Sequence, residues 1–70
     1  MKNYMTFNRT WWIYNSEWPD GLEPGAGDKL DIQHWDTEEE AREHCQHMNS
    51  DPANFPANNE LSMKYEFAKV

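Results

Sequence analysis

A single cysteine, Cys45, most limits how this 70-residue chain can fold, because it leaves no partner for an intramolecular disulfide. A domain of this size hides only roughly 60% of the surface that its unfolded chain exposes, so its core must be dense. Ten aromatic residues meet that need, since each removes a large apolar area from water. We therefore expect one small domain, residues 1–70, that folds without disulfides or a metal.

Features at the N-terminus and the composition bear on where the protein resides. Disulfides are rare in the reducing cytoplasm, which agrees with the lone cysteine. No apolar signal core follows Lys2, and no stretch approaches the roughly 20 apolar residues that span a bilayer. These features predict a soluble, cytoplasmic protein.

Alternation of polar and apolar side chains predicts three strands. In residues 3–14 the pattern runs from Met5 to Ile13, and we expect a bend or bulge at Asn8-Arg9, although a lead-in followed by a strand from Thr10 also fits. Residues 29–35 place Leu30 and Ile32 on one face, against Asp31 and Gln33 on the other. Residues 61–67 alternate most regularly and predict a strand with one buried face.

Residues 15–28 are rich in residues that interrupt regular structure. These residues are Pro19, Gly21, Pro24, Gly25 and Gly27. Their density excludes both a helix and a central strand, so we expect a long loop, and loops of this length are usually functional or disordered. A second irregular segment is expected at residues 50–59.

The clearest local signal is a capping box, Thr37 followed three residues later by Glu40. It predicts a helix that begins there and runs to about residue 48 or 49, where Asn49 can adopt the left-handed conformation that ends a helix. Glu38 and Arg42 are spaced to form a supporting ion pair.

The element order strand, strand, helix, strand predicts an α+β fold. With a right-handed crossover, the third strand pairs beside the first, which gives a three-stranded antiparallel sheet of order 2-1-3. The helix covers one face of this sheet. The second face, on which we expect Trp12 or Tyr14, remains partly open.

Negative charge is concentrated in the middle of the chain. Thirteen acidic residues face six basic ones, and eleven of the acids lie between Glu17 and Asp51, where only Lys29 and Arg42 oppose them. Duplex nucleic acid and anionic lipid surfaces would be repelled, which predicts no direct binding to nucleic acid or membrane. A cationic partner is favoured.

The predicted helix separates an apolar face from an acidic face. Ala41, Cys45 and Met48 form the apolar face. The opposite face carries Asp36, Glu39, Glu40 and Glu43. A helical rise of about 1.5 Å per residue spaces these four carboxylates roughly 3.5 Å apart along the axis, close to the roughly 3.4 Å between charges on one DNA strand. The acidic face is therefore either a mimic of nucleic acid or an ordinary solvated surface.

The loop at residues 15–28 supplies a second set of candidate binding residues. Either Trp18 and Leu22 fold back onto the open sheet face, or they are anchors for a partner. In the second case the surrounding acids would suit a basic pocket on another protein. The candidate binding residues in this loop are Glu17, Trp18, Asp20 and Glu23.

Catalytic and metal-binding patterns are weak. His44 and His47 lie one helical turn apart, but Cys45 points about 100° away from His44, so the three cannot converge on a metal. We expect surface histidines and a buried, unreactive cysteine. No glycine loop precedes a helix in the way that phosphate binding requires. The sequence therefore predicts no enzyme, cofactor or metal.

In size, acidity, α+β layout and lack of catalytic motifs, the chain resembles small phage-encoded inhibitor proteins, including anti-CRISPR proteins. The resemblance spans the whole chain and implies a mode of action: a non-enzymatic inhibitor in the host cell cytoplasm that blocks a basic, nucleic-acid-binding surface of a defence complex. The alternative is a small accessory module that binds a protein through Trp18 and the open sheet face.

Overall fold

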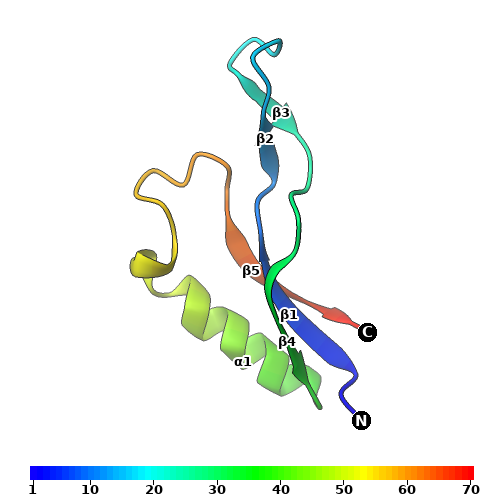
Figure 1. Cartoon of the computed structure of the whole chain (residues 1–70). Coiled ribbons are helices and arrows are strands. Elements are labelled where there is room, and N and C mark those ends of the chain that lie inside the picture. The colour runs from blue at the N-terminus through cyan, green and yellow to red at the C-terminus, as the bar shows by residue number, and fades with distance from the viewer.

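A three-stranded antiparallel sheet with one helix on one face forms the body of the computed structural model, which describes all 70 residues (Figure 1). A two-stranded hairpin extends from this body. The elements are β1 (Tyr4–Arg9), β2 (Trp12–Tyr14), β3 (Leu22–Pro24), β4 (Leu30–Trp35), α1 (Glu38–Asn49), the 3-10 helix η1 (Pro52–Asn54) and β5 (Lys64–Lys69). The molecule is elongated and thin, with extents of 44, 24 and 14 Å.

The predicted α+β class and sheet order are confirmed. The spatial order is β4-β1-β5, with β1 antiparallel to both neighbours. Since β1, β4 and β5 correspond to the first, second and third predicted strands, this is the order 2-1-3. The helix between β4 and β5 carries the chain across one face of the sheet, as the crossover argument requires.

A bulge interrupts the pairing of β1 with β4. Thr6 pairs with Gln33 and Asn8 pairs with Leu30, so β4 contains one more residue than β1 over this interval. Asp31 lies in the bulge with a φ of 51°, a left-handed conformation that aspartate tolerates better than most residues. This bulge lies on β4, opposite Phe7, whereas the break expected at Asn8-Arg9 in the N-terminal segment lies just after it, at Thr10 and Trp11.

The bulge also changes the faces predicted for β4. The sequence predicts Leu30 and Ile32 on one face of the strand, but Leu30 pairs with Asn8 beyond the bulge, and the two side chains are 54% and 50% exposed. The extra residue breaks the simple alternation on which that prediction rests, and β4 is an edge strand with little covering its outer side.

The N-terminal strand is shorter than predicted, because β1 ends at Arg9 and β2 is a separate strand. Trp12 and Tyr14 therefore belong to the hairpin rather than to the open face of the main sheet, which corrects that prediction.

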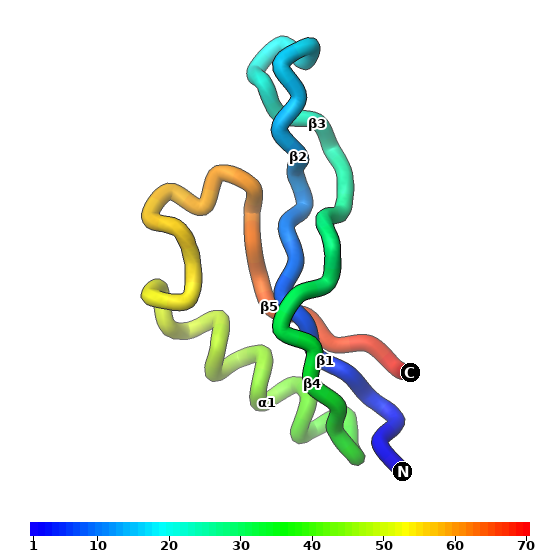
Figure 2. Tube along the Cα trace, in the orientation of Figure 1, coloured from blue at the N-terminus to red at the C-terminus, as the bar shows by residue number.

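The predicted long loop at residues 15–28 contains β3 and forms a hairpin. Trp12 pairs with Pro24 and Tyr14 with Leu22, and Gly21 closes the turn with a φ of 79°. Proline disfavours a central strand, but both strands of a hairpin are edge strands, which tolerate it. Figure 2 shows this arm extending away from the helix and the main sheet.

The last strand also begins later than predicted. The Asn59 side chain binds both the N–H and the C=O of Met63, at 2.8 and 2.9 Å, and Ser62 has a φ of 55°. This turn keeps Leu61 and Met63 out of the sheet, so β5 begins at Lys64.

The helix agrees with its capping signal. The Thr37 hydroxyl oxygen accepts from the Glu40 N–H at 3.2 Å, and the hydroxyl lies 3.0 Å from a Glu40 carboxylate oxygen, to which it donates. The helix ends at Asn49, within the predicted range, but Asn49 stays helical instead of adopting the left-handed conformation, and Ser50 caps the helix with a φ of −79°. The Asn49 side chain instead binds the backbone of Tyr65 in β5.

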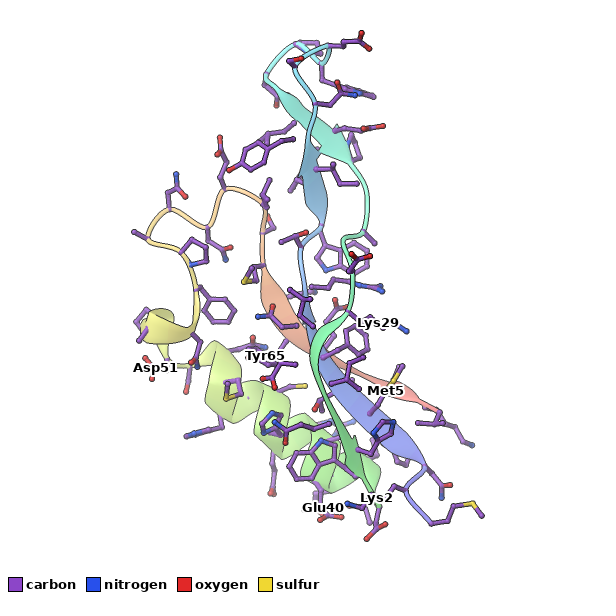
Figure 3. All side chains as sticks on the ribbon, viewed as in Figure 1. Lys2, Met5, Lys29, Glu40, Asp51 and Tyr65 are labelled. Atoms are coloured by element: carbon purple, nitrogen blue, oxygen red, sulfur yellow. The ribbon has the colours of Figure 1, made fainter.

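The core between α1 and the sheet is small. Ala41 and Cys45 are buried, which confirms the predicted apolar face, and Met48 is half-buried. Tyr65 is buried opposite them, and Figure 3 shows it between α1 and the sheet. His44 packs against the ring of Trp35 at 4.9 Å.

Candidate functional site

The acidic residues of the helix lie at its exposed start. The Thr37 cap places Glu39 and Glu40 in the first turn, Glu43 follows one turn later, and all three are exposed. Asp36 is also exposed but precedes the cap residue Thr37, so it lies outside the helix. The predicted phosphate-like spacing therefore applies to three carboxylates rather than four.

Only one ion pair forms in the molecule, between Arg42 and Glu38 at 3.4 Å, as the four-residue spacing predicted. It lies on the surface, with the two side chains 57% and 51% exposed, so it adds little stability. Glu39, Glu40 and Glu43 have no basic partner. The helix start therefore presents carboxylates whose charge no neighbouring side chain neutralises.

The second group of candidate residues lies on the hairpin. Glu17, Trp18 and Asp20 are exposed in the turn, where an Asp20 oxygen accepts from the Leu22 N–H at 3.0 Å. Glu23 is half-buried and accepts a hydrogen bond from Asn15 at 3.3 Å. Asp20 and Glu23 therefore stabilise the hairpin through hydrogen bonds in addition to giving it negative charge.

Trp18 does not fold back onto the open sheet face. It is 43% exposed in the turn of an arm that points away from the sheet (Figure 1). Two backbone hydrogen bonds fix this turn, from the Trp18 N–H to Asn15 and from the Gly21 N–H to Trp18. Trp18 is therefore exposed, and the alternative in which it packs on the open sheet face does not agree with the structure.

The two acidic groups lie toward opposite ends of the molecule. The hairpin turn is at one end, and Glu40 is at the end of α1 that lies furthest from it (Figure 3). The connection from β3 to β4 runs between them and carries exposed Asp28, and exposed Asp31 follows in β4. The predicted acidic surface is therefore a line of separated charges along the molecule, because strand pairing extends residues 15–28 into an arm.

The remaining polar groups differ in their surroundings. Burial and the nearby charge of Glu66 raise the pKa of the Cys45 thiol. His44 was expected at the surface, but it is half-buried, and its Nε2 atom is buried without a hydrogen-bond partner.

His, Cys, Asp and Glu side chains do not gather in threes around a possible metal position, and the surface has no pocket. No helix has the length and apolar character needed to cross a membrane.

The sequence did not predict a cluster of cations and aromatic rings that lies on the sheet face opposite α1. We call it the cation ladder, and its residues are Phe7, Arg9, Trp11, Lys29 and Lys64. In it, Lys29 and Arg9 lie 4.9 and 5.0 Å from the centre of the Phe7 ring. Arg9 and Lys64 lie 5.5 and 5.8 Å from Trp11. Alternation along β1 puts Phe7 and Arg9 on one face, but only the strand register brings the lysines to them.

No family model matches the chain, and no curated protein or solved structure is significantly similar to it. Its function must therefore be argued from the geometry of these surfaces.

Proposed function

We propose that this chain is a non-enzymatic inhibitor that binds a basic, nucleic-acid-binding surface of a host defence complex of the CRISPR type. The exposed carboxylates at the start of α1 form the centre of the contact and act as a nucleic-acid mimic or a steric block. The hairpin residues Glu17, Trp18, Asp20 and Glu23 extend the contact along the molecule.

The observation that carries this proposal is that Glu39, Glu40 and Glu43 are exposed and unpaired in a protein of net charge −7. Unpaired acids on a rigid helix keep their charge available to a partner, whereas acids in surface ion pairs would already be neutralised. A field of this sign steers a basic surface into contact and weakens as salt screens it. Binding should therefore be fast and sensitive to ionic strength.

The experiment begins with capture of a partner from a host lysate on the immobilised protein, followed by purification of the captured complex. Its dissociation constant is then measured for the wild type and for a Glu39→Lys, Glu43→Lys variant. Glu40 is left unchanged because its carboxylate binds the Thr37 hydroxyl at the helix cap. We expect binding to weaken at least about tenfold, since each reversal replaces an attraction of up to about 1 kcal/mol by a repulsion.

A matched control is Asp28→Lys with Glu60→Lys, which changes the net charge equally at two exposed positions outside the proposed contact. It should weaken binding less than the helix variant, and duplex DNA should compete with the wild type for the complex. Equal losses in the two variants would mean that net charge alone governs binding, and the proposal would then fail. Circular dichroism establishes that each variant is folded.

A second candidate function is favoured by the exposure of Trp18, which is 43% exposed in the turn of the projecting hairpin. A tryptophan so placed suits a small protein-interaction module that inserts it into a pocket on its partner. In that case Trp18→Ala abolishes binding, and salt has little effect. The acids then serve solubility alone.

A further inference from the structure

We infer that the sheet face opposite α1 binds an acidic segment of a partner protein through Arg9, Lys29 and Lys64. This goes beyond the proposed function, which uses the acids of the helix and the hairpin. It concerns a surface of opposite charge on the other side of the sheet.

The strand register places the cation ladder on one face. Thr6 and Asn8 of β1 are buried toward α1, so Phe7 and Arg9 point to the opposite face. Phe7 pairs with Glu66, and Arg9 pairs with Lys64 of β5. Lys29, which directly precedes β4, reaches the Phe7 ring from the other side of β1, and it lies on the opposite side of the sheet from Tyr65 (Figure 3).

The two aromatic rings hold three positive charges close together. Arg9 contacts both rings, while Lys29 contacts only Phe7 and Lys64 only Trp11. Attraction to the ring faces offsets part of the repulsion among the cations. Phe7 is only 4% exposed, and Arg9 and Lys29 are among the side chains that cover its ring in the folded protein.

None of the three cations has an ion-pair partner, although the chain has thirteen acidic residues. Glu66 is the acid that shares this face, and one of its oxygens accepts the indole N–H of Trp11 at 3.0 Å. The Arg9 Nε atom is buried without a hydrogen-bond partner. The ladder thus presents three cations without an ion-pair partner beside the single carboxylate of Glu66, and the unpaired Arg9 donor lies below the surface.

Carboxylates of a protein segment suit this surface better than a nucleic-acid strand does. Single-stranded nucleic acid binds by stacking bases on aromatic rings, but here cations already lie over the rings. A protein segment can also add apolar side chains to its carboxylates, and exposed Ile32 on neighbouring β4 offers them a contact.

The test uses hexaglutamate, blocked at both ends, as the probe and nuclear magnetic resonance at low ionic strength as the readout. Adding the peptide to the ¹⁵N-labelled full chain should shift the indole N–H signal of Trp11 and the Nε–H signal of Arg9, and leave that of Trp18 unchanged. No shift at millimolar peptide overturns the inference.

A Lys29→Met, Lys64→Met variant removes two charges but keeps side chains long enough to cover the rings. It should bind the peptide about tenfold more weakly, since each exposed ion pair is worth up to about 1 kcal/mol. The matched control, Lys2→Met with Lys69→Met, removes two lysines outside the ladder and should bind almost as well as the wild type. An equal loss in the control overturns the inference.

Two further outcomes would also overturn it. Tighter binding of hexathymidylate than of hexaglutamate would make nucleic acid the occupant. Self-association in sedimentation that disappears in the Lys29→Met, Lys64→Met variant would make a second copy the occupant. The Glu39→Lys, Glu43→Lys variant should still bind hexaglutamate, so failure here and failure of the proposed inhibitor function are separate results.

Discussion

Replacement of Asn49 by alanine tests how the helix is attached to the sheet. The Asn49 amide nitrogen donates to the Tyr65 carbonyl at 3.0 Å, and its oxygen accepts from the Tyr65 N–H at 2.8 Å. Because β5 has only one neighbouring strand, half of its backbone groups face away from the sheet, and Asn49 binds two of them. The Asn49 side chain therefore makes the two backbone hydrogen bonds that a fourth strand would make at Tyr65.

The expected cost follows from these two bonds. Each contributes a net of about 0.5–1.5 kcal/mol, so their loss costs about 1–3 kcal/mol. Alanine favours a helix by up to about 0.7 kcal/mol over asparagine, which offsets part of that loss. The free energy of unfolding should therefore fall by about 0.3–3 kcal/mol, and Tm by about 4–8 °C for each kcal/mol in a domain of this size.

Urea unfolding followed by tryptophan fluorescence measures this change. Gln46→Ala is the control, because Gln46 is exposed on the same helix and its side chain makes no hydrogen bond, so it should be neutral or slightly stabilising. A loss of less than about 0.3 kcal/mol for Asn49→Ala would refute the attachment role, since two hydrogen bonds at their lowest net value exceed the gain in helix propensity by that amount.

Three other outcomes are expected. Thr37→Ala should lower the free energy of unfolding by about 1 kcal/mol in the same assay, because it removes the helix cap. Cys45 should react slowly with a thiol reagent at pH 8 and rapidly in urea, because burial, and then the charge of Glu66, raise the pKa of its thiol. Burial, followed by the hydrogen bond to Asp31, raises the pKa of the Tyr65 phenol above 10, so its ultraviolet titration should be shifted upward. Since the folded pKa exceeds the unfolded one, this group stabilises the fold below pH 10, and the contribution is lost as pH rises through the folded pKa.

Local signals in the sequence were sufficient for the helix and for the sheet order. The Thr37 cap depends on residues that are neighbours in the chain, and the structure reproduces it. The order β4-β1-β5 follows from one helix between two strands and the preferred handedness of that connection. The sequence also located the end of the helix at about Asn49, but not the hydrogen bonds from the Asn49 side chain to Tyr65, because Tyr65 lies sixteen residues further along the chain.

The hairpin and the bulge were missed for a related reason. Pro24 and Gly25 resemble loop residues when read locally, but β3 needs only one partner, β2, and an edge position accepts a proline. The bulge at Asp31 depends on the register between two strands, which no single segment reveals. The candidate acids were all identifiable from the sequence, but their division between two ends of the molecule was not.

The distribution of charge constrains how any partner can bind. Ala41 and Cys45 turn one side of α1 toward the sheet, so Glu39 and Glu43 point away from it, while Arg9 lies on the far face of the same sheet. Acids and cations are thus separated by the thickness of two layers, which explains why they form no ion pair with each other. A flat partner surface can cover either the helix acids or the cation ladder, but not both. The helix acids and the cation ladder must therefore serve separate contacts, made by two partners or by two segments of one partner that wraps around the edge of the sheet.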